Sequence, residues 1–261
     1  LNARLFVRNT KEVKLSDDGK DLYRYARQMI DLQKKIEERF ETGKEESKHL
    51  ITIAASTIPA QYILPKILMK FNERYPKEQV KLLETDSSQV VTQIIDHMVD
   101  VGFTGTVLEK KHCKYIPFYK DELVVITPNT EKYQKLLEDM PDDISWIGGE
   151  HLIMREEGSG TRKEAGKQLR AAGINLDKLK IIASIENQET IKKSVKQGMG
   201  ISVISRLAAE DEVKYGDLLA FSIPKADQGR DINLVYNKNY QMSKSTERFV
   251  KIVKEVYGIE E

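Results

Sequence analysis

The stretch LITIAASTIPAQYILPKILMKFNERYPKEQVKLLETDSSQVVTQIIDHMVDVGFTG, residues 50–105, alternates short apolar runs with longer amphipathic ones. The short runs have the length and composition of buried strands, and they lie at 50–55, 80–84 and 100–104. Helices fit between them, at 59–75 and 88–98. This βαβαβ order predicts a parallel sheet with right-handed crossovers.

The rest of the chain continues the alternation. Strand-like runs are predicted at 123–127, 151–155, 179–185, 201–205 and 231–237, and the chain runs through 218–223 before the last of them. Helices are predicted at 131–139, 161–172, 188–197 and 244–256. The chain therefore divides into two similar α/β subdomains, and we expect the last strand and helix to return to the first. The predicted boundaries are 49–127 with 224–261 for subdomain I, and 128–223 for subdomain II.

The first fifty residues have a different pattern. Two short strands around a polar turn predict a β-hairpin within residues 1–15, and Ser16 then offers an N-cap for a helix. Apolar residues recur on this helix at spacings of three and four, as in a coiled-coil seam: Leu22, Tyr25, Met29, Leu32 and Ile36. We predict a dimerisation helix followed by a charged hinge, over residues 16–48. The alternative is that the helix packs on its own domain.

Composition excludes several classes of protein. With 261 residues, 40% hydrophobic content and a net charge of +1, the chain is globular and has no overall basic field that would attract nucleic acid.

The lone Cys113 excludes an intramolecular disulfide and fits a reducing compartment. Together with His112, it is expected to lie in a loop. No cofactor or metal is predicted. With no signal-peptide pattern and no membrane-length apolar run, we expect a cytoplasmic protein that does not contact membranes.

Hydroxyl and acidic side chains follow the predicted strands of subdomain I. In an open parallel sheet, ligands bind outside the carboxyl ends of strands. The residues at these positions are candidates for ligand binding: Ser56, Thr57, Asp86, Ser87, Thr104 and Gly105.

Subdomain II has a counterpart in MREEGSGTR, residues 154–162. Glycines allow the backbone to approach a ligand, and the helix that follows offers free amides to an anion. The candidate anion-binding residues are Arg155, Ser159, Gly160, Thr161 and Arg162, with Glu186 closing the pocket from the next strand end. The alternative is a simple glycine-rich connection whose arginines pair with Glu156 and Glu157.

Catalytic signatures are missing. The GSGTR turn lacks the Gly-Lys-Ser/Thr ending of a nucleotide P-loop, and its glycine spacing does not fit the dinucleotide fingerprint. No Ser-His-Asp or Cys-His pattern stands out among the four scattered histidines. We therefore do not expect an enzyme.

Three segments together resemble the LysR-type transcriptional regulators. LNARLFVRNTKEVKLSDDGKDLYRYARQM is similar to the end of their winged helix-turn-helix and the linker helix. REEGSGTR and VKQGMGISVIS are similar to signatures of their effector-binding domain. The branch concerned with sulfur, selenium or one-carbon metabolism looks closest.

The resemblance implies two Rossmann-like subdomains of periplasmic-binding-protein type, preceded by a wing hairpin and a long dimerisation helix. It implies a small anionic effector between the subdomains, a homodimer or homotetramer, and DNA binding in the full-length protein. The wing residues that could touch DNA phosphates are Arg8, Lys11 and Lys14. The family's DNA-recognition helices would precede Leu1, so we expect this chain to come from a longer protein.

The leading hypothesis is the effector-sensing and oligomerisation part of such a regulator. Two alternatives use the same two-lobed architecture. One is a solute-binding protein for a small anion, and the other is an enzyme that works in the same cleft.

Overall fold

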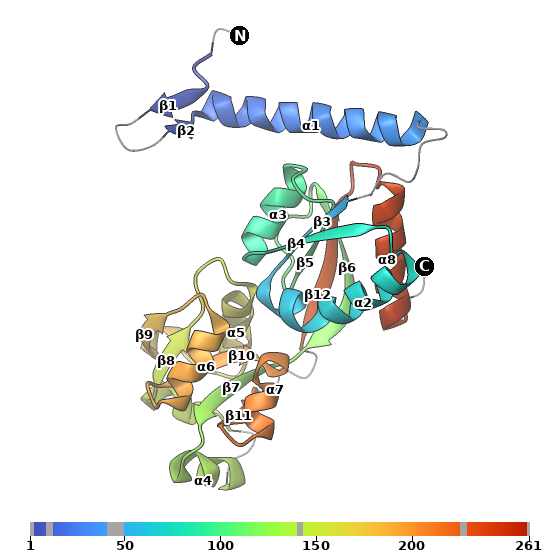
Figure 1. The fold of residues 1–261 in the computed structure, drawn as a ribbon. Helices are drawn as coiled ribbons and strands as arrows, with labels where there is room; N and C mark the ends of the chain where they lie inside the picture. The colour runs from blue at the N-terminus through green and yellow to red at the C-terminus, as the bar shows by residue number, and fades with distance from the viewer. Residues whose placement is uncertain (1–2, 9–12, 41–49, 140–142, 225–228, 260–261) are drawn as a thin grey trace.

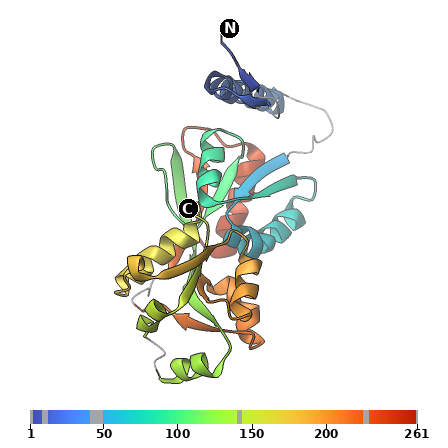
Figure 2. The ribbon, with the colours of Figure 1, turned by 90° about the vertical axis from the view of Figure 1, so that its left-hand side faces the viewer.

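The computed structural model describes residues 3–8, 13–40, 50–139, 143–224 and 229–259. A hairpin with a long helix is followed by two α/β subdomains (Figure 1). Figure 2 shows the same order from the side, with the hairpin and helix at the end of subdomain I that is remote from subdomain II. Among the described helices, none has both the length and the apolar character that crossing a bilayer requires.

The hairpin and the first helix are confirmed. Strand β1 (Phe6–Arg8) pairs antiparallel with β2 (Val13–Leu15). Helix α1 (Asp17–Phe40) begins after Ser16, whose Oγ accepts a hydrogen bond from the Gly19 amide at 2.9 Å, as expected of an N-cap. The polar turn at 9–12 and the hinge at 41–48 lie outside the described residues.

Subdomain I is a five-stranded sheet in the order β4-β3-β5-β12-β6. Its strands are β3 (Leu50–Ala55), β4 (Gln79–Glu84), β5 (Val101–Thr104), β6 (Cys113–Asp121) and β12 (Arg230–Asn237). Its helices are η1 (Pro59–Ile63), α2 (Leu64–Arg74), α3 (Ser87–Ile95) and α8 (Lys244–Tyr257). Strands β4, β3 and β5 are parallel as predicted, while β12 runs antiparallel to β5. The last strand and helix therefore return to subdomain I, as expected.

Strand β6 corrects the sequence prediction. Cys113, expected in a loop, begins this strand and is buried. The strand was missed because it contains Pro117 and because its apolar residues do not alternate regularly. The pairing with β12 shifts register beside Pro117, which is where a β-bulge tolerates a residue without an amide hydrogen.

Subdomain II is a second five-stranded sheet in the order β11-β7-β10-β8-β9. Its strands are β7 (Leu123–Pro128), β8 (His151–Met154), β9 (Lys180–Ser184), β10 (Ile201–Ser205) and β11 (Leu218–Ser222). Its helical segments are α4 (Glu131–Asp139), η2 (Ser145–Gly149), α5 (Gly160–Ala171), η3 (Leu176–Lys178), α6 (Gln188–Lys196) and α7 (Arg206–Lys214). Helix α7 was not predicted, because it follows β10 without any turn residues.

The crossing between the subdomains lies earlier than expected. We placed 123–127 in subdomain I, but β7 pairs with β10 and β11 of the second sheet. A single residue, Glu122, separates β6 of one sheet from β7 of the other. The predicted boundary differs from the observed one because the sequence of an apolar strand does not indicate which of two sheets the strand joins.

One hydrophobic cluster extends through both subdomains. In subdomain I it includes Phe71 of α2 and Phe249 of α8, whose rings meet edge to face with centroids 5.2 Å apart. In subdomain II it includes Ile153 of β8 and Ile204 of β10. Burial of each such side chain contributes about 1.5–3 kcal/mol. This shared cluster packs the two subdomains against each other, next to a polar cavity at their boundary.

Candidate functional site

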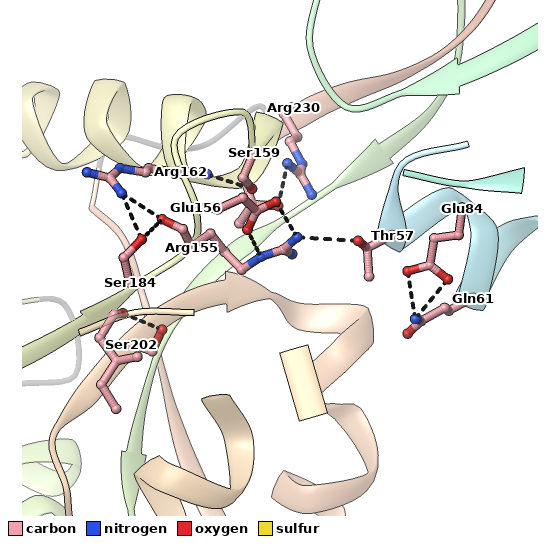
Figure 3. Close-up of polar contacts among 12 residues, drawn as sticks. Thr57, Gln61, Glu84, Arg155, Glu156, Ser159, Arg162, Ser184, Ser202 and Arg230 are labelled. Atoms are coloured by element: carbon pink, nitrogen blue, oxygen red, sulfur yellow. Dashed lines mark hydrogen bonds and ion pairs between the residues drawn. The ribbon is translucent and has the colours of Figure 1, made fainter. Parts of the chain in front are cut away.

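A small cavity lies between the subdomains and is lined from both sides. It encloses about 10 Å³ of free space, roughly the room of a single water molecule. Its lining residues are Ser56, Thr57, Ile58, Thr85, Asp86, Ser87, Arg155, Glu156, Ser159, Gly160, Thr161 and Arg230. Figure 3 shows the polar contacts around it.

Eight of the twelve candidate ligand residues line this cavity: Ser56, Thr57, Asp86, Ser87, Arg155, Ser159, Gly160 and Thr161. Turns that follow β3 and β4 in subdomain I thus face the turn that follows β8 in subdomain II. The structure brings them together because the carboxyl ends of these strands point toward the subdomain boundary.

The glycines of the GSG turn are explained by the other subdomain. A Cβ on Gly160 would lie 2.7 Å from the Ser87 Oγ, and one on Gly158 would lie 2.9 Å from the Asp86 carboxyl carbon. Both distances are shorter than real Cβ contacts. In the present arrangement both glycines therefore make room for subdomain I.

Arg155 reaches across the boundary from subdomain II to subdomain I. Its side chain is only 5% exposed, and its Nη2 lies 3.4 Å from the Thr57 Oγ1 (Figure 3). The Nε and Nη2 atoms also donate to the two carboxylate oxygens of Glu156, at 2.8 and 2.9 Å. The pairing with Glu156 was one of the alternatives that the sequence left open.

The other four candidates do not line the cavity. Arg162 turns toward β9 and donates to the Arg155 carbonyl at 2.8 Å and to the Ser184 hydroxyl at 3.3 Å (Figure 3). Glu186 is exposed. Thr104 is buried and donates to the Thr106 carbonyl, while Gly105 lies beside the guanidinium of Arg230.

Sequence reasoning missed Arg230, at the start of β12. Its Nη2 and Nε each lie 2.8 Å from the Asp121 carboxylate, and its Nη1 donates to the Thr161 Oγ1 at 3.0 Å. Asp121 also accepts from the Ser205 hydroxyl at 2.5 Å. Both members of the ion pair are almost fully buried. The ion pair links the two connecting segments to each other, and the Arg230–Thr161 hydrogen bond links them to helix α5. A change in the relative orientation of the subdomains would therefore alter these contacts.

Glu122, beside that ion pair, is also held across the crossing. It accepts from the Arg206 guanidinium at 2.5 and 2.9 Å, and its carbonyl accepts from the Arg206 amide at 2.8 Å. The hydrogen bond from Arg206 holds the pKa of Glu122 below its ordinary value of 4.5.

Helix termini add to the electrostatic character of the cavity. Helices α3 and α5 both begin there, and the N-terminal amides of a helix favour an anion. The Asp86 carboxylate caps α3 by accepting from the amides of Ser88 and Gln89, at 2.7 and 2.9 Å. Within the described residues, no group of three or more His, Cys, Asp or Glu side chains could hold a metal ion.

The remaining candidates lie far from this cavity. On the hairpin, Arg8 belongs to β1 and Lys14 to β2, while Lys11 lies outside the described residues. Four seam residues of α1 are 51–71% exposed in the single chain, namely Tyr25, Met29, Leu32 and Ile36, and Leu22 is partly buried.

Known proteins match this architecture. The chain is 28% identical over 250 residues to an uncharacterised HTH-type transcriptional regulator, YeiE of Escherichia coli K12, covering 96% of this chain and 82% of that one. The regulatory domain of Synechocystis PCC6803 CcmR, solved in complex with 2-PG, superposes with a TM-score of 0.71 at 24% identity, over 80% of this chain and 97% of that one. The effector-binding domain of QuiR, in complex with shikimate, gives 0.71 at 16% identity, over 81% and 98%.

The family model described as the LysR substrate binding domain matches residues 44–258. That match takes in both subdomains and the strands that connect them. It confirms the resemblance drawn from the sequence and the predicted fold class. The chain belongs to the LysR-type transcriptional regulators, of which it carries the effector-binding domain.

Proposed function

We propose that this chain senses a small anionic metabolite or oxyanion, which binds between the two subdomains. The observation that carries the proposal is the position of Arg155, a buried guanidinium directed from subdomain II at Thr57 of subdomain I. A guanidinium binds a carboxylate, sulfate or phosphate through two parallel hydrogen bonds. An anion held there would touch both subdomains at once.

The surrounding groups suit the same chemistry. Ser56, Thr57 and Ser87 supply hydroxyl donors from subdomain I, while the first amides of α5 supply donors from subdomain II. The ligands named for two similar structures, 2-PG and shikimate, are both small anions, which supports this class of ligand. The relatives are transcriptional regulators, so we give the cleft a sensing role and not a catalytic one.

The cavity as it stands is too small for such a ligand, and in this proposal the subdomains separate to admit the ligand and then close on it. An effector shifts this equilibrium only if it binds the two arrangements with different affinity. Contacts from both sides of the cavity provide that difference, because they form together only when the subdomains are close. The connecting segments at Glu122 and Arg230 would act as the hinge.

Oligomerisation and DNA binding complete the proposal. We assign the exposed seam of α1 to pairing with a second copy, because four large side chains on one helical face lack cover in the single chain. A homodimer or homotetramer would convert subdomain closure into altered spacing of DNA-binding domains. The wing residues Arg8, Lys11 and Lys14 are proposed to contact DNA phosphates in the full-length protein.

Calorimetric titration tests the pocket. Sulfate, inorganic phosphate, 2-PG and shikimate are titrated into the wild type, Arg155→Ala, Thr57→Ala and the control Arg170→Ala, which removes an exposed arginine from the far end of α5. We expect Arg155→Ala to weaken the best of these anions at least tenfold, because a charge-assisted hydrogen bond contributes about 1.5–3 kcal/mol. Thr57→Ala should weaken it severalfold, and Arg170→Ala should have no effect. Unchanged affinity in both pocket variants would locate the effector elsewhere.

A further inference from the structure

We infer that Glu156 is an internal competitor for the effector, occupying the guanidinium of Arg155 until an incoming anion displaces it. The inference rests on the proposed function and adds a regulator of affinity to the same site. In the present arrangement both Glu156 oxygens accept hydrogen bonds from the Nε and Nη2 edge of Arg155. This is the geometry that a bound carboxylate or phosphate would adopt.

Charge counting makes displacement necessary. The cavity is lined by two cations, Arg155 and Arg230, and by two carboxylates, Asp86 and Glu156. Arg230 is in addition paired with the buried Asp121 behind the cavity. The site therefore has no spare positive charge, and an anion that entered it unchanged would lie close to the carboxylate of Glu156.

Of the three carboxylates, Glu156 is the one that can leave. Asp121 is fully buried and is held by both Arg230 and Ser205. Asp86 caps α3 through two backbone amides, so its departure would expose the start of that helix. Glu156 is 21% exposed, follows the end of β8, and has Arg155 as the partner of its side-chain carboxylate. It can turn to water without disturbing the cap of α3 or the buried pair of Asp121 and Arg230.

Space leads to the same conclusion. The cavity has room for about one water molecule, and Glu156 is one of its lining residues. Rotation of this side chain toward solvent would free both the space and the guanidinium edge that an anion needs. The mechanism selects ligands that offer at least two acceptor oxygens to Arg155, because a single-acceptor group would not replace the hydrogen bonds lost from Glu156.

Glu156→Gln provides the test, since it keeps the shape of the side chain and removes its charge. Glu157→Gln is the matched control: it makes the same charge change one residue away, on an exposed side chain that does not line the cavity. Inorganic phosphate, sulfate, shikimate and 2-PG are titrated by calorimetry into both variants, the wild type and Arg155→Ala. Thermal unfolding of each variant verifies that it is folded, and Glu156→Asp serves as a second variant that retains the charge.

We expect the anion bound best by the wild type to bind Glu156→Gln about tenfold more tightly, which corresponds to about 1.4 kcal/mol. Glu157→Gln and Glu156→Asp should stay within about threefold of the wild type. If Arg155→Ala weakens binding but Glu156→Gln leaves it unchanged or weaker, Glu156 orients Arg155 instead, and the inference fails while the proposed function stands. If Arg155→Ala binds as the wild type does, or if none of the variants binds any of the four anions, the proposed function fails and the inference with it.

Discussion

Gly160 of subdomain II lies against Ser87 of subdomain I so closely that a Cβ on Gly160 would be 2.7 Å from the Ser87 Oγ. Each residue is the first of its helix, α5 and α3, so two helix N-termini meet at this contact. A Cβ on Gly160 would also lie 3.2 Å from the Thr106 Cγ2, so a side chain at position 160 would force these groups of subdomain I to move.

Gly160→Ala should therefore hold the subdomains apart. We expect a larger radius of gyration in small-angle scattering and at least a severalfold loss of affinity for an anion such as phosphate or 2-PG. Gly148→Ala is the control, since a Cβ at Gly148 would meet nothing within 4 Å. If Gly160→Ala matches the wild type in both measurements, the close approach does not matter for binding.

The ion pair of Asp121 and Arg230 should carry much of the stability of the hinge. Asp121→Asn would leave a buried guanidinium without its charge partner, which typically costs about 3–5 kcal/mol. Asp231→Asn breaks an exposed pair with Lys120 on the same two strands and should change stability by less than about 1 kcal/mol. Urea denaturation measures the free energy of unfolding of each variant. An equal decrease in the two variants would show that the buried pair stabilises the fold no more than the exposed pair does.

The contrast between Arg155 and Arg230 shows how far sequence reasoning extends. Arg155 was predicted because it ends a recognisable strand and precedes a glycine turn, and parallel strands bring such turns to one edge. Arg230 begins a strand, where no ligand residue is expected. Its contact with Thr161 joins positions 69 residues apart through the crossing of the two subdomains. Such a contact depends on how the subdomains are placed, and local pattern does not encode that placement.

The fold followed from local pattern more completely than the site did. Strand 50–55 and helix 131–139 were predicted with the bounds that the structure gives. Strand β6 was missed because it contains Pro117, which is unusual within a strand. Helix α7 was missed because no turn residues separate it from β10. The direction of Arg162 was also beyond the sequence, since it is decided by the carbonyl of Arg155 and the hydroxyl of Ser184.

Cys113 should be unreactive toward thiol reagents and peroxide in the folded chain. It is buried at the start of β6, and burial raises the pKa of its thiol to about 11. Because the thiolate is the reactive form, little of it exists at neutral pH. Labelling with a chromogenic disulfide at pH 8 should be slow until the protein is unfolded in urea. Labelling of the native chain at the rate of a free thiol would contradict the buried position.

The hinge contact of Glu122 predicts a pH dependence. Its pKa is lower in the folded chain than the ordinary value of 4.5, so its ion pair with Arg206 stabilises the fold above that value. The contribution is lost as the pH falls through the lowered pKa. Urea denaturation should show Glu122→Gln to be less stable than the wild type at pH 7, with a smaller difference at about pH 3. A difference that stays constant with pH would mean that the charge of Glu122 is not involved.

The seam of α1 should control self-association. Met29→Glu introduces a charge into the predicted interface and is expected to dissociate the oligomer, because a charge buried there would lack a partner. Tyr23→Glu is the control, because Tyr23 is an exposed large side chain of the same helix outside the seam, 46% exposed against 71% for Met29. Sedimentation velocity measures the mass of each variant. An unchanged mass for Met29→Glu would remove α1 from the interface.

The most direct test of the account is a crystal structure of this chain with the anion that calorimetry ranks first among sulfate, phosphate, 2-PG and shikimate. We predict that an anionic oxygen lies about 2.7–3.2 Å from Arg155 Nη2, between Thr57 and the N-terminus of α5. We also predict that the Glu156 carboxylate has turned away from the Arg155 guanidinium. An anion bound outside this cavity, with the contacts among Arg155, Glu156 and Thr57 unchanged, would contradict the claim that the chain senses its effector between the subdomains.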